Sequence, residues 1–123
     1  MRTFDQLYLR MKRYIFGVDY VYDKNVGYIV WQYSSGENVE ILFIEAKDPG
    51  NGQGKELVRR MLHQIKPYHS VFVIRRAIND EAGKFYRSLG FTETVIKGLY
   101  KDEDAVFGVA SYEQLLKTYE ITS

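Results

Sequence analysis

Apolar residues along this chain recur with two different periods. Over the first fifteen residues they fall three or four positions apart, as they do on one face of a helix. This spacing predicts a helix over about residues 3–13, with Thr3 as its N-cap. From Gly17 onward the period becomes two, which is the period of a β-strand. The apolar positions of the helical stretch are Phe4, Leu7, Tyr8, Met11 and Ile15.

Three strands are expected to follow with only short turns between them. Alternating apolar and polar residues predict strands over 18–23 and 26–33, and a compact apolar run, 41–44, predicts the third. Short polar segments at 24–25 and 34–37 separate these runs. Strands joined by turns this short pair with their neighbours in an antiparallel sense, so we expect a meander.

The second half of the chain alternates helices and strands. Apolar residues at helical spacing predict a helix over about 54–65, and Pro67 prevents its continuation. A short buried strand is expected over 70–75. Asn79 is expected to cap a second helix, which ends at Gly90. The remaining expected elements are strands over 91–95 and 105–109 and a last helix over 112–119.

This order of elements predicts an α+β fold with α/β/α layers, in which helices cover both faces of a mixed, mostly antiparallel, twisted sheet. A helix joins the third strand to the fourth, so these two strands should run parallel. The length of 123 residues fits a single domain over 1–123. The proportions of hydrophobic residues (46%) and charged residues (27%) are those of a globular chain.

Charge and composition exclude several classes of protein. The formal net charge is +1 without a block of like charges, so there is no clear signal for nucleic-acid binding. The chain has no cysteine, which excludes disulfides, thiolate zinc sites and a cysteine nucleophile. With two histidines, we expect no metal site. No apolar run approaches the ~20 residues that span a bilayer, and no leader opens the chain, so we expect a cytoplasmic protein without a membrane partner.

Three glycines stand at every second position between the third strand and the following helix. They are Gly50, Gly52 and Gly54. Glycine lets a ligand approach bare backbone, and the first N–H groups of a helix have no partner within the helix. Together with the helix dipole, these N–H groups favour an anion, above all a phosphate.

Two common phosphate loops fail on particular residues. A nucleoside-triphosphate loop of the Walker A type requires glycine at the position of Pro49 and a hydroxyl residue at that of Glu56. The dinucleotide pattern requires its third glycine at the position of Lys55. Neither motif therefore explains the loop.

A third pattern fits. The segment Pro49-Gly-Asn-Gly-Gln-Gly54 resembles motif A of the GNAT superfamily of acetyl-CoA-dependent N-acetyltransferases, Arg/Gln-x-x-Gly-x-Gly/Ala, although Pro49 replaces the Arg or Gln. A second segment, from Asn79 to Phe91, is similar to motif B, with its Asn, Ala, Phe-Tyr and Gly-Phe in register. One helix and one strand separate the motifs, as in the family, and the resemblance covers about residues 18–109.

The resemblance implies acetyl-CoA as co-substrate, without a metal, and a GNAT-like sheet whose central parallel strand pair is splayed apart. The pantetheine arm would lie in that gap, against the backbone of Leu42, Phe43 and Ile44. Asn79 matches the family position that hydrogen-bonds the same arm. The pyrophosphate would rest on the backbone N–H groups of the loop, which comprises Gly50, Asn51, Gly52, Gln53, Gly54 and Lys55.

The implied reaction moves an acetyl group to a primary amine by direct attack in a ternary complex. Tyr86 occupies the family's general-acid position and would protonate the leaving thiolate. Many members place a basic glutamate where this chain has Ile74, so Glu45 is the candidate base, acting directly or through water. The acceptor is a small molecule or a protein.

Two alternatives remain open at this point. Without the family's Arg and Glu, the chain could be a catalytically impaired CoA-binding or regulatory module of the same fold. A protein-interaction domain that keeps only the fold is the second, and Pro49 favours it. The segment before the meander is short for the family, so either the acceptor site is open, which suits a large acceptor such as a protein, or a second subunit closes it in a homodimer.

Overall fold

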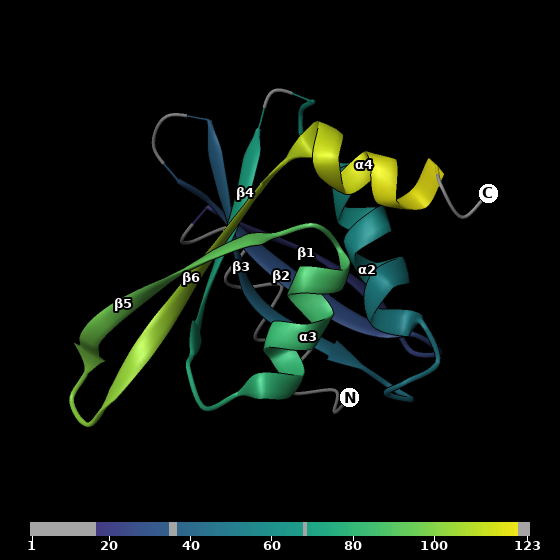
Figure 1. Cartoon of the computed structure of the whole chain (residues 1–123). Helices are drawn as coiled ribbons and strands as arrows, with labels where there is room; N and C mark the ends of the chain where they lie inside the picture. Colours follow the sequence, from purple (N-terminus) through teal and green to yellow (C-terminus); the bar gives the residue numbers. More distant parts are fainter. Residues whose placement is uncertain (1–16, 35–36, 68, 121–123) are drawn as a thin grey trace.

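The computed structural model describes residues 17–34, 37–67 and 69–120, and in them a six-stranded sheet with helices packed against it (Figure 1). The helix predicted over 3–13 lies outside these residues. The strands are β1 (Val18–Asp23), β2 (Gly27–Ser34), β3 (Asn38–Ala46), β4 (Ser70–Arg76), β5 (Thr92–Tyr100) and β6 (Glu103–Ser111). The helices are α2 (Gln53–Leu62), α3 (Asp80–Ser88) and α4 (Tyr112–Glu120).

The strand order across the sheet is β1-β2-β3-β4-β6-β5. The first three strands form the predicted antiparallel meander. Strand β4 runs parallel to β3, as the intervening helix requires, and pairs antiparallel with β6 on its other side. Strand β5 pairs antiparallel with β6 at one edge. The mixed, mostly antiparallel α+β fold expected from the sequence is therefore confirmed.

The parallel pair β3 and β4 separates along its length. Their ladder is restricted to three pairs, Asn38 with Ser70, Val39 with Val71 and Glu40 with Phe72, although both strands continue well beyond. A bulge in β3 lies at the point of separation. On β2, Trp31 pairs with Ile41 and Val30 pairs with Phe43, so Leu42 is the extra residue. The bulge bends β3 away from β4, and the splayed pair implied by the resemblance is confirmed.

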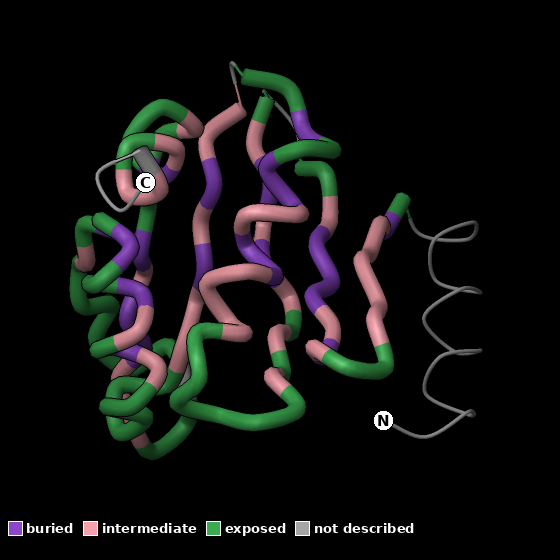
Figure 2. Tube along the Cα trace, turned by 90° about the vertical axis from the view of Figure 1, so that its right-hand side faces the viewer, coloured by how far each residue is buried: buried purple, intermediate pink, exposed green. Residues whose placement is uncertain are grey.

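The main hydrophobic core lies between the sheet and the described helices, all of which contribute to it. In Figure 2 the buried positions run along the central strands and the inner sides of helices. A smaller cluster on the opposite face joins Val18 and Val30 with partly buried Tyr20, Tyr28 and Leu42. No helix of the described residues belongs to that cluster, so helices on both faces stay a prediction. The main core comprises Ile29, Trp31, Val39, Ile41, Leu57, Val58, Met61, Leu62, Ile65, Val71, Val73, Tyr86, Leu89, Phe91, Ala110 and Leu115.

The last two strands are longer than the predicted ranges of 91–95 and 105–109. They form a hairpin that projects from the body of the protein in Figure 1, and its closing pair joins Tyr100 to Glu103. Gly98 has a positive φ of 69°, which is typical of a turn, and the ladder is irregular between Ile96 and Tyr100. Pairing resumes beyond this irregularity, at Tyr100 and Glu103, so the hairpin extends past the predicted ranges.

Candidate active site

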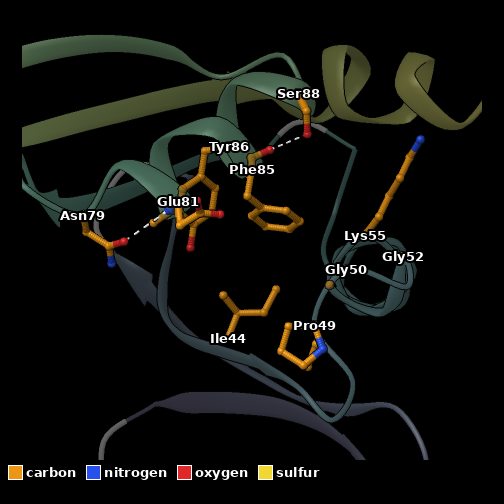
Figure 3. A pocket seen from close by; sticks show the side chains of 13 residues that line it. Ile44, Pro49, Gly50, Gly52, Lys55, Asn79, Glu81, Phe85, Tyr86 and Ser88 are labelled. Carbon is orange, nitrogen blue, oxygen red and sulfur yellow. Dashed lines mark hydrogen bonds between the residues drawn. The ribbon is translucent and has the colours of Figure 1, made fainter.

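A cleft runs between the start of α2, helix α3 and the gap between β3 and β4 (Figure 3). It consists of two adjoining cavities of about 530 and 510 Å³. The first lies between the glycine loop and α3, and the second lies in the splayed gap. Both are lined by Ile44, Asn79, Ala82 and Tyr86, so these residues form the junction of the two cavities.

The glycine loop brings the uncapped start of α2 to this cleft. Gly50 and Gly52 have φ angles of 92° and 78°, in the left-handed region that favours glycine. Gly52 is the N-cap and supplies no side-chain hydrogen bond. The first hydrogen bond of the helix runs from the N–H of Glu56 to the carbonyl of Gly52. The preceding N–H groups of the first turn therefore have no partner within the helix and can bind an anion.

The third glycine allows the two helices to meet. A Cβ atom at Gly54 would lie 3.1 Å from a ring carbon of Phe85, closer than most contacts of real Cβ atoms. Phe85 also lines the first cavity (Figure 3). Because position 54 carries no side chain, the start of α2 packs directly against α3 across the floor of the cleft.

Other predicted loop residues have different roles. The side chain of Gln53 accepts a hydrogen bond from the N–H of Asp48 at 2.7 Å and donates one to the carbonyl of Asn25 at 3.0 Å. Its side chain therefore fixes the loop, and only its backbone N–H remains for a ligand. Asn51 is exposed and is not among the lining residues. The Lys55 ammonium lies 5.4 Å from the ring centroid of Tyr119.

Tyr86 lies at the junction of the two cavities, on the inner face of α3. Tyr86 is 5% exposed, and its ring contacts those of Phe85 and Phe91 edge to face at centroid distances of 5.2 and 5.3 Å. The hydroxyl points into the cleft (Figure 3) and forms no hydrogen bond with the described residues. Burial raises the pKa of Tyr86 to about 12, and the nearby Arg75 guanidinium acts in the opposite direction. The hydroxyl is therefore protonated at neutral pH.

The start of helix α3 is closed by a side-chain N-cap. The Asn79 side chain accepts a hydrogen bond from the N–H of Ala82 at 3.2 Å, which confirms the predicted N-cap. Tyr86 follows Asn79 by seven residues, which is two helical turns, so both occur on the same side of the helix. Leu42, Phe43 and Ile44 line the second cavity with these two residues, so the cleft brings together the predicted pantetheine positions.

Glu45, the candidate base, is not brought together with Tyr86. It is exposed and accepts a hydrogen bond from the Tyr28 hydroxyl at 2.9 Å. It lines a separate small cavity of about 130 Å³. A second carboxylate of β3, Glu40, belongs to the last pair before the strands separate, and burial raises its pKa. Glu40 stands between Val39 and Ile41, whose side chains belong to the main core, so its own side chain is on the opposite face of the sheet and is not among those that line the two cavities.

Arg75 is a cleft residue that the sequence analysis missed. Its side chain is 9% exposed, and its Nε donates to Glu93 at 2.9 Å. Its Nη1 donates to the carbonyl of Asn79 at 3.1 Å, and the residue lines the second cavity. A Cβ at Gly83 would lie 2.6 Å from Nη2 of Arg75. The sequence signal for this role was an arginine at an inward position of β4. A glycine within the following helix, Gly83, leaves room for its guanidinium.

Neither a metal-binding cluster nor a helix that could span a membrane occurs among the described residues. Within residues 17–34, 37–67 and 69–120 there is no group of three or more His, Cys, Asp or Glu side chains that could hold a metal ion. In that same part of the chain no helix has the length and apolar character to cross a membrane.

Comparison with known proteins gives the family. A sequence model of the acetyltransferase (GNAT) domain matches residues 2–113. A GNAT-family protein from Desulfovibrio desulfuricans has a similar structure, with a TM-score of 0.73 and 17% identity over 88% of this chain and 76% of that one. The comparison with curated proteins gave no match.

Two further structures have related folds. Ard1 from Thermoplasma volcanium is 28% identical, with a TM-score of 0.57 over 69% of this chain and 62% of that one. A GNAT-family acetyltransferase from Elizabethkingia anophelis, solved with acetyl-CoA bound, is 18% identical, with a TM-score of 0.67 over 83% and 81% of the two chains. The match of the family model over most of the chain, together with these folds, shows that the protein belongs to the GNAT acetyltransferase family.

Proposed function

We propose that this protein is an N-acetyltransferase that moves an acetyl group from acetyl-CoA to a primary amine by direct attack in a ternary complex. One observation carries the proposal. A single cleft extends from the uncapped start of α2 into the gap between β3 and β4, with the Tyr86 hydroxyl at the junction. The relative from Elizabethkingia anophelis, which has acetyl-CoA bound, supports the choice of co-substrate.

The two cavities suit the two parts of acetyl-CoA. The pyrophosphate would accept hydrogen bonds from backbone N–H groups of the loop from Gly50 to Lys55. The pantetheine arm would pair with the backbone of β3 at residues 42–44, where β4 no longer does. The side-chain N–H₂ of Asn79 is available to the same arm, because its Oδ1 atom is the one that caps α3.

The residues of the chain then handle the protons of the transfer. The amine nitrogen bonds to the acetyl carbon, the carbon–sulfur bond breaks, and the electron pair leaves with the sulfur. Tyr86 donates its hydroxyl proton, or a hydrogen bond, to this sulfur. Because burial raises the pKa of Tyr86 to about 12, the hydroxyl stays protonated until the sulfur leaves the acetyl carbon. A backbone N–H near Ile44 would stabilise the acetyl oxygen as negative charge develops on it.

A carboxylate of β3 would take the proton released by the amine. The sequence favours Glu45, which could act through water. Two observations favour Glu40 as its competitor, namely its place at the separation of β3 and β4 and the raised pKa of its carboxyl group. A base works best when its pKa lies near the working pH, so a raised carboxyl pKa suits the role. Substitution of each glutamate separates them.

The acceptor and the assembly belong to the proposal as well. The acceptor is an amine of a small molecule or of a protein, and a panel must include both. A homodimer would close the acceptor side with a second subunit, and light scattering in solution tests it by the measured mass. A cytoplasmic location also remains a prediction, to be tested by fractionation of cells that express the protein.

The decisive experiment measures binding and turnover separately. Acetyl-CoA should raise the melting temperature, and thiol release should follow when an accepted amine is added. The absence of a shift at millimolar acetyl-CoA would contradict the proposal. A shift without thiol release from any amine of the panel would instead support the CoA-binding module that has lost catalysis.

A further inference from the structure

Helix α4 touches both helices that border the cleft. It follows β6 directly and lies across the end of the molecule beside α2 (Figure 1). Leu115 is fully buried in the main core, and Tyr112 and Tyr119 pack against that core. This burial fixes the helix to the body of the protein. Two hydrogen bonds from its last turn then reach the main chain of α2 and of α3.

The first of these bonds joins α4 to the phosphate loop. The Tyr119 hydroxyl donates to the carbonyl oxygen of Lys55 at 2.6 Å, within the first turn of α2. The Lys55 ammonium lies over the Tyr119 ring, within the range of a cation–π contact. In Figure 3 the Lys55 side chain extends away from Gly50 toward the ribbon of α4. Burial raises the pKa of Tyr119, which keeps its hydroxyl a donor.

The second bond joins α4 to the other side of the cleft. Thr118 Oγ1 donates to the carbonyl of Leu89 at 3.0 Å, and Leu89 is the C-cap of α3. The neighbouring residues Thr118 and Tyr119 therefore bind the end of α3 and the start of α2. On the floor of the cleft the same two helices meet through Gly54 and Phe85. Their separation is thus held by contacts at the floor and by the bonds from α4.

We propose that α4 is a clasp that sets the width of the cofactor cleft, with Tyr119 and Thr118 as positioning residues for the pyrophosphate end of acetyl-CoA. This inference rests on the proposed function. Neither side chain lines the cleft, so both act through the main chain of Lys55 and Leu89. Loss of either bond lets the first turn of α2 shift relative to α3, which misplaces the N–H groups that bind phosphate.

The test compares two acetyl donors. Acetyl-CoA carries the pyrophosphate, whereas S-acetylpantetheine has the same thioester and arm but no phosphate. Tyr119→Phe and Thr118→Val should each raise the KM for acetyl-CoA about three- to tenfold, which is the effect of one hydrogen bond, with kcat within about twofold of wild type. For S-acetylpantetheine, kcat/KM measured in the first-order range should not change.

The matched control is Tyr112→Phe, which removes a hydroxyl from the same helix where no hydrogen bond to the described residues is lost. It should leave both donors unaffected, and thermal unfolding records the stability of every variant. Equal losses with both donors, or no loss with either, would overturn the clasp. If wild-type protein neither binds nor uses acetyl-CoA, the proposed function fails too. A normal wild type with unaffected variants overturns the clasp alone.

Discussion

Helices α2 and α3 both begin at the rim of one cleft, and they begin in opposite ways. The start of α3 is closed by its own chain, since Asn79 accepts the N–H of Ala82. The start of α2 is open, because its N-cap Gly52 has no side chain to offer. A glycine N-cap leaves a helix less stable than a capping side chain would by only about a few tenths of a kcal/mol, and it leaves N–H donors for a ligand. Under the proposed function, α2 binds the phosphate and the capped α3 carries the proton donor.

The largest effect is expected from substitution of Tyr86, the proposed proton donor on α3. Tyr86→Phe should lower kcat by about 10³-fold, because it removes the proton donor, while the Kd for acetyl-CoA changes less than about twofold. Tyr86 is active as the protonated form, so its own ionisation lowers activity only as the pH rises through about 12. Rapid-mixing kinetics and calorimetry measure the two quantities. A large rise in Kd would break the division between the two helices.

Strand β3, which precedes α2, carries both candidate bases. Glu40→Gln should lower kcat/KM by about 10²-fold and remove the fall in rate at acid pH. The sign follows from the raised pKa of Glu40, since a base loses activity as the pH falls through its pKa. Glu45→Gln is the matched variant on the same strand and should keep this acid limb. The reverse pattern in the pH profiles would return the role to Glu45.

A negative charge at the uncapped start of α2 should strongly weaken the binding of acetyl-CoA. In Gly52→Asp a carboxylate is placed beside the N–H groups proposed to bind the phosphate, so the KM for acetyl-CoA should rise about 10- to 100-fold. Gly52→Asn is the control, because Asn has nearly the same shape, tolerates the left-handed φ and carries no charge. It should have a smaller effect. Equal effects would mean that charge at this position does not decide binding.

Removal of the side-chain cap of α3 should have the smallest effect on stability and on acetyl-CoA binding. Asn79→Ala should reduce the free energy of unfolding by about 1 kcal/mol and raise the KM for acetyl-CoA about threefold. Asn79→Ser keeps a capping oxygen but lacks the amide, so it should regain stability without regaining affinity. Chemical denaturation and steady-state kinetics distinguish the two losses. Full recovery of affinity in the Ser variant would reduce Asn79 to a helix cap.

Local signals explain why most of the elements around the candidate site could be predicted. The alternation of apolar residues identified the strands of the meander, the glycine loop placed the start of α2 at about residue 54, and Asn79 identified the start of α3. The extent of β5 and β6 could not be read in this way, because pairing across the hairpin resumes beyond an irregularity at Gly98, a residue that by itself predicts a turn. Arg75 was missed for a similar reason. Its environment depends on Gly83 and Glu93, which come from a helix and a strand that follow it.

The sequence by itself determined the order of the elements, the glycine loop and the inward face of Tyr86. These features depend on local backbone preference and on the period of apolar residues, which a single stretch of chain contains. The tertiary structure decided what those stretches meet. The bulge at Leu42 separates β3 from β4, the Gln53 side chain is engaged in fixing its loop, and Glu45 faces Tyr28 rather than Tyr86. Each of these depends on contacts between distant segments, which no local pattern specifies.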